Sequence, residues 1–76
     1  MALSENLKIA REQKGYTLEY VADRVHVERQ TIWKYEQGIM IPNGIMLVEI
    51  ADVFGTTCEK LVKSNAKKFL SEISNN

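Results

Sequence analysis

The chain has 76 residues, enough for a single domain over 1–76, and its ten basic and ten acidic residues balance to a net charge of zero. A nucleic-acid-binding surface would therefore need local clustering of charge, and a lone cysteine excludes an internal disulfide or a metal cluster around it. No spacing suggests a nucleophile with its base, and no apolar run approaches the ~18 residues of a membrane span, so we expect a cytoplasmic protein with no enzyme activity, cofactor, metal, small-molecule ligand or membrane partner.

A first helix is predicted from about Ser4 to Lys14 by a stripe of residues at three- and four-residue spacing. The stripe consists of Leu3, Leu7, Ala10 and Lys14. Gly15 follows where a helix C-cap would stand, because glycine permits the left-handed backbone that ends a helix. Ile9 falls off the stripe, so we expect another part of the chain to cover it.

Two short helices with a tight turn between them are predicted next. Thr17 is a suitable N-cap for a helix over residues 18–24 or 18–25, since its hydroxyl can accept a hydrogen bond from an orphan backbone N–H. Residues 25–27 form the turn, and a third helix follows over residues 28–37. Gly38 ends this third helix at a C′ position.

The third helix has two very different faces. With Ile32 at the centre of the buried face, Tyr35 and Glu36 fall within about 60° of it on a helical wheel. The opposite side carries Gln30, Trp33, Lys34 and Gln37, with Arg29 at the border. A plain surface helix would more often show Glu, Lys and Ala there. This outer face is suited to a helix that enters a DNA groove.

Two further helices complete the chain. Pro42 stops regular structure, and Asn43 offers the N-cap of a helix over residues 44–54 that Gly55 closes. The buried positions of this helix are Leu47, Ile50, Ala51 and Phe54. Thr56 and Glu59 have capping-box spacing. They predict a fifth helix that begins near Thr57 or Cys58 and continues to about Ser74, with apolar positions Leu61, Val62, Ala66, Phe69, Leu70 and Ile73.

These elements resemble the phage-repressor and Cro-like (XRE) family of helix-turn-helix proteins, over about residues 3–62. The residues that carry the resemblance are Arg11, Lys14, Gly15, Thr17, Val21, Ala22, Val25, Val27, Thr31, Ile32, Tyr35, Glu36, Gly38, Pro42, Leu47, Ile50, Ala51, Gly55 and Leu61. The resemblance implies an all-α fold, a compact five-helix lambda-repressor-like domain whose second and third helices form the helix-turn-helix. Residues 63–74 would be an added helical extension at the C-terminus.

The resemblance also implies a function. The protein would be a sequence-specific transcriptional regulator, a repressor, which binds double-stranded DNA as a homodimer with the third helix in the major groove. Arg29 would contact guanine and Gln30 adenine, Lys34 a base or a phosphate, and Trp33 a thymine methyl or a sugar. The residues expected to hold the phosphate backbone are Thr17, Thr31, Gln37 and Asn43. Arg11 and Glu36 would form a structural ion pair between the first and third helices.

The chain departs from the family pattern at four places. Leu18 stands where the family usually has Gln, and His26 where it usually has Gly, although His tolerates the left-handed region better than most residues. Glu28 replaces the usual Ser or Thr cap of the third helix, and its carboxylate would face DNA phosphates. The loop over residues 39–41 is Ile-Met-Ile, where the family is often rich in Lys or Arg.

A second hypothesis is a protein-interaction module on the same fold, similar to an antirepressor or an antitoxin. It would bind another regulator through Trp33, the loop over residues 39–41 and the C-terminal helix. The zero net charge, Leu18 and Glu28 favour this hypothesis, whereas Arg29, Gln30 and Lys34 favour the first. The candidate dimer or partner surface consists of Met40, Ile41, Phe69, Leu70 and Ile73. The pattern leaves open whether residues 39–41 join the local core and whether the tail packs on the first helix near Ile9.

Overall fold

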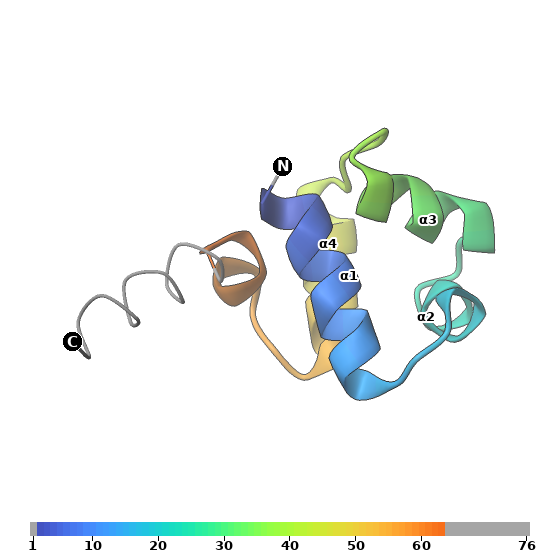
Figure 1. Cartoon of the computed structure of the whole chain (residues 1–76), viewed down its shortest axis with the longest axis horizontal. Coiled ribbons are helices and arrows are strands. Elements are labelled where there is room, and N and C mark those ends of the chain that lie inside the picture. Colours follow the sequence, from blue (N-terminus) through green and yellow to red (C-terminus); the bar gives the residue numbers. More distant parts are fainter. Residues whose placement is uncertain (1, 64–76) are drawn as a thin grey trace.

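The computed structural model describes residues 2–63, which form four helices and the first turns of a fifth (Figure 1). The helices are α1 (Ala2–Lys14), α2 (Leu18–Arg24), α3 (Arg29–Gln37) and α4 (Gly44–Phe54), followed by helical residues 58–63. The described part contains no strand and no helix long and apolar enough to cross a membrane. The expected all-α, five-helix class is confirmed. The predicted extension, with Phe69, Leu70 and Ile73, lies outside the described residues.

Side-chain caps define where two of these helices begin. The Thr17 hydroxyl accepts from the backbone N–H of Tyr20 at 3.0 Å, and Asn43 Oδ1 accepts from the N–H of Met46 at 2.8 Å. Each bond satisfies one of the orphan N–H groups that a helix leaves at its first turn. Both caps were predicted from the sequence, and both are confirmed.

The expected cap of the fifth helix was wrong by one residue. The Thr57 hydroxyl, and not that of Thr56, accepts from the N–H of Lys60, at 3.2 Å. The reason lies in the preceding helix, because the N–H of Thr56 donates to the carbonyl of Ala51 at 2.9 Å and so completes the C-terminal turn of α4. Thr56 is therefore part of the α4 terminus, and the next residue starts the new helix.

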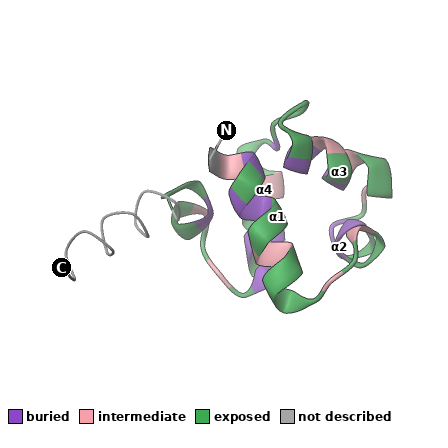
Figure 2. Cartoon of the chain, viewed as in Figure 1, coloured by how far each residue is buried: buried purple, intermediate pink, exposed green. Residues whose placement is uncertain are grey.

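Every helix contributes buried residues, coloured purple in Figure 2, and their side chains form one core. It consists of Leu7, Val21, Ala22, Val25, Ile32, Tyr35, Ile50, Ala51, Phe54 and Leu61. The predicted stripes of the four helices supply nearly all of these, although Leu47 is only half-buried and Lys14 is exposed. Ser4 and Asn6 are also buried, and the apolar pattern gave no sign of them.

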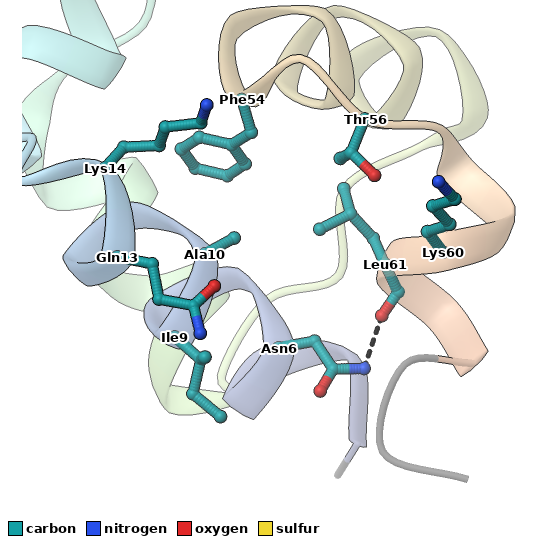
Figure 3. A pocket seen from close by; sticks show the side chains of 9 residues that line it. All are labelled: Asn6, Ile9, Ala10, Gln13, Lys14, Phe54, Thr56, Lys60 and Leu61. Carbon is teal, nitrogen blue, oxygen red and sulfur yellow. Dashed lines mark hydrogen bonds between the residues drawn. The ribbon is translucent and has the colours of Figure 1, made fainter. Parts of the chain in front are cut away.

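Asn6 fastens the start of the fifth helix to α1. Its Nδ2 donates to the backbone carbonyl of Leu61, whose side chain is buried in the core (Figure 3). Its Oδ1 has no hydrogen-bond partner in the described part of the chain. A hollow of about 440 Å³ lies beside this contact, lined by Asn6, Ile9, Ala10, Gln13, Lys14, Phe54, Thr56, Lys60 and Leu61. Ile9 lines this hollow and is 45% exposed, so residues 2–63 leave it only partly covered.

A partly buried fork of hydrogen bonds from Arg11 joins three parts of the fold. Its Nε and Nη2 donate to the two carboxylate oxygens of Glu36 on α3, at 2.6 and 3.1 Å. Its Nη1 donates to the carbonyl of Tyr16, at 2.8 Å, in the connection between α1 and α2. The exposed fractions of the Arg11 and Glu36 side chains are only 14% and 3%. The hydrogen bonds that Arg11 donates to the Glu36 carboxylate raise the pKa of Arg11, so the guanidinium stays charged at any physiological pH.

The turn between α2 and α3 depends on an unusual backbone at His26. Its φ of 60° lies in the left-handed region, where a side chain with a Cβ is strained. The N–H of Val27 then donates to the carbonyl of Ala22 at 3.0 Å and closes the turn. The turn predicted over residues 25–27 is confirmed.

Removal of the Arg11 side chain should unfold the domain more easily. In Arg11→Ala the Glu36 carboxylate stays buried without its partner, so the free energy of unfolding should fall by about 3–5 kcal/mol in urea titrations. Arg11→Lys should lose less, because it keeps the charge but not the fork. The matched control is Lys63→Ala, which removes the exposed pair with Glu59 and should change stability by less than about 1 kcal/mol. An Arg11→Ala loss no larger than that of the control would contradict this role.

Relief of the strain at His26 should stabilise the protein. His26→Gly removes the Cβ penalty of the left-handed backbone, which outweighs the extra chain entropy of glycine, and should raise the free energy of unfolding by up to about 1 kcal/mol. His26→Ala keeps the Cβ and should give no such gain. Thermal and urea unfolding of both variants provide the measurement, and equal stabilities for Gly and Ala would show that the relief of strain does not outweigh the chain entropy of glycine.

Candidate nucleic-acid interface

The outer face of α3 carries an aromatic, two amides and two cationic side chains. Arg29, Gln30, Trp33 and Gln37 are exposed, with 41% of Trp33 accessible, and Lys34 and Thr31 are half-buried. The inner face buries Ile32, Tyr35 and Glu36, as the helical wheel predicted. The two faces therefore have separate tasks, since the inner one holds the helix and the outer one is free to meet a ligand.

The beginnings of α2 and α3 meet at a surface hollow. This hollow has a volume of about 320 Å³ and is lined by Leu18, Arg29, Gln30 and Trp33. It thus brings together three of the four residues expected to contact bases, with Leu18 as an apolar wall. Lys34, the fourth, does not line it. Leu18 belongs to this group only in three dimensions, and its departure from the family pattern was the one sequence signal for it.

Two of the residues expected to hold phosphates also cap helices. Thr17 and Asn43 are exposed, and their oxygens accept from the first turns of α2 and α4. The Thr17 hydroxyl proton and the Asn43 amide N–H groups can still donate to an anion. Each also stands at the positive end of a helix dipole, which favours a phosphate there. Of the other two, Gln37 is exposed at the end of α3 and Thr31 is half-buried in its first turn.

The ion pairs explain how a neutral chain can present a cationic helix. The carboxylate of Glu36, the acidic residue within α3, is held by Arg11 on the inner face. Among residues 2–63, Arg29 and Lys34 form no ion pair, so their charges remain available to a ligand. Glu28 opposes them, because it is the exposed N-cap of α3 and makes no capping hydrogen bond through its side chain.

Five exposed apolar side chains follow α3 along the chain. They are Ile39, Met40, Ile41, Ile45 and Val48, and we call this group the apolar surface. The alternative that residues 39–41 join the local core was wrong, since Ile39 and Ile41 are each 63% exposed. Pro42 is buried in their place, while the N–H groups of Ile39 and Met40 both donate to the carbonyl of Lys34.

The sequence interpretation missed Ile45 and Val48 on α4. They are three residues apart and lie off the buried stripe of that helix, which was a detectable signal. Ile45 is the more exposed of the two, at 75%. They extend the apolar surface from the loop onto α4, so it is larger than the loop residues alone predicted.

Comparison with known proteins gives a consistent result. A family model described as helix-turn-helix matches residues 7–61. The HTH-type transcriptional regulator AnsR of Bacillus subtilis (strain 168) is 33% identical over 64 residues, covering 84% of this chain and 55% of AnsR.

Two further relatives come from the same organism. The uncharacterized HTH-type transcriptional regulator YqaE is 35% identical over 71 residues, covering 91% of this chain and 61% of YqaE. The SPbeta prophage-derived uncharacterized HTH-type transcriptional regulator YonR is 35% identical over 72 residues, covering 93% of this chain and 67% of YonR. The chain therefore spans between about half and two thirds of the length of these relatives.

Proposed function

Because this chain belongs to the Cro-like (XRE) helix-turn-helix family, we propose that it is a DNA-binding transcriptional regulator, a repressor that acts in the cytoplasm. Two copies form a homodimer and place their α3 helices in successive major grooves, about 34 Å apart. The observation that supports this most is the outer face of α3, where Arg29 and Lys34 have no ion pair within the described residues and flank exposed Gln30 and Trp33.

Each side chain of the interface has a role that follows from its chemistry. The Arg29 guanidinium suits the N7 and O6 acceptors of a guanine, and the Gln30 amide suits the N7 and N6 groups of an adenine. Trp33 packs on a sugar or a thymine methyl. Lys34 is half-buried and points its charge at a phosphate. The register on the backbone is set by Thr17, Thr31, Gln37 and Asn43.

The apolar surface supplies the contact between the two copies in this proposal. It follows α3 directly along the chain, so a partner seated there stays beside the recognition helix. The candidate residues Met40 and Ile41 lie within it, whereas Phe69, Leu70 and Ile73 are outside the described residues. The antirepressor- or antitoxin-like alternative would use the same side chains, and relatives named as transcriptional regulators do not favour it.

Selection from a library of random DNA duplexes tests the proposal directly. The expected result is an enriched palindromic motif with half-sites about one helical turn apart. The affinity for that motif should fall steeply with salt, with a logarithmic slope of about −0.9 for each phosphate contact. Failure to enrich any motif, together with a flat salt response, would refute DNA reading by α3 and leave the protein-interaction alternative.

Substitutions on α3 should separate base reading from phosphate binding. Arg29→Ala should relax the preference at one base position and cost about 1–3 kcal/mol on the selected site, because it removes a bidentate contact. Lys34→Ala should weaken all duplexes alike and reduce the salt slope by about one. Fluorescence anisotropy titrations against the selected and scrambled duplexes measure both effects. Lys63→Ala removes an exposed lysine outside α3 and should bind like the wild type, so an equal loss there would indicate nonspecific charge attraction.

A further inference from the structure

Leu18 gives the base-reading surface an apolar wall. It is the first residue of α2, and its half-buried side chain packs against the core with one side. Its other side lines the 320 Å³ hollow that Arg29, Gln30 and Trp33 complete. One water molecule takes up about 30 Å³, so the hollow can admit the edge of a base. Polar groups of Arg29 and Gln30 and apolar groups of Leu18 and Trp33 therefore line the same hollow.

The major groove offers few apolar groups that such a wall could contact. The base edges there present hydrogen-bond donors and acceptors, except for the methyl group on C5 of thymine. Cytosine methylated on C5 carries the same group at the same place. Leu18 has no hydrogen-bonding atom in its side chain, so it gains nothing from a phosphate or a polar base edge. A methyl group is the ligand that both Leu18 and the ring of Trp33 can cover.

We propose that the hollow between Leu18 and Trp33 binds the methyl group of a 5-methylpyrimidine, next to the bases read by Arg29 and Gln30. The occupant in an unmodified operator is thymine, and 5-methylcytosine at the same position is read as its equivalent. Leu18 is thus a specificity residue in place of a phosphate-binding one. This inference rests on the proposed DNA binding, and it adds one base to those that Arg29 and Gln30 recognise.

The test compares duplexes that differ by a single methyl group. Each thymine of the selected half-site is replaced in turn by deoxyuridine, and one further duplex pair carries cytosine or 5-methylcytosine at the position found. Loss of one buried methyl should weaken binding about fourfold at one position and hardly at all elsewhere. Adding the methyl to cytosine there should strengthen binding by a similar factor. If cytosine is insensitive to its methyl, thymine alone is the ligand and the equivalence is refuted.

The ratio of two dissociation constants for the same variant makes the test independent of folding losses. In Leu18→Ala the ratio between the deoxyuridine and thymine duplexes should fall from about four to near one. Ile9→Ala, an exposed substitution on α1, should keep the wild-type ratio. Methyl sensitivity at no position, or an undiminished ratio in Leu18→Ala, would overturn the assignment while leaving the proposed function intact. If the random library yields no bound duplex, both fall together.

Discussion

The fork of hydrogen bonds from Arg11 is the interaction on which the arrangement of this domain depends. A carboxylate buried on the inner face of α3 would be costly without a partner, and Arg11 supplies both of its hydrogen bonds. The third donor reaches the Tyr16 carbonyl and holds the chain just before α2. One side chain of α1 therefore contacts both α3 and the connection that leads into α2. The core packs the two helices of the helix-turn-helix together, and the fork ties α3 to α1.

The same interaction resolves the difficulty posed by the neutral composition. The net charge counts every acidic and basic residue alike, whereas Arg11 and Glu36 neutralise each other in one partly buried pair. What matters for a polyanionic ligand is the charge left on the face that meets it. On α3 that charge comes from Arg29 and Lys34, and Glu28 stands against it at the N-cap. The local balance, and not the total, decides the electrostatics of this face.

Much of the fold was predictable because the ends of its helices are set by residues close in sequence. Thr17 and Asn43 cap the helices that follow them, and Gly38 and Gly55 end helices in the left-handed conformation. What failed depends on tertiary context. The choice of Thr57 over Thr56 follows from how α4 ends, and the burial of Asn6 follows from a carbonyl 55 residues away in sequence. The hollow beside Leu18 forms where α2 and α3 come together, and residue spacing along the chain does not predict that contact.

Division of labour between the two faces of α3 has an evolutionary consequence. The buried residues of α3 are Ile32, Tyr35 and Glu36, so a substitution at any of them should lower the free energy of unfolding. The side chains of Gln30 and Trp33 are exposed and make no hydrogen bond with other described residues, so substitutions there should leave the scaffold intact. Under the proposed DNA binding, single substitutions on this outer face would change the target sequence while the domain stays folded. Leu18 is the exception, because it packs against the core and also lines the hollow, and its identity should change more slowly than that of the other residues that line it.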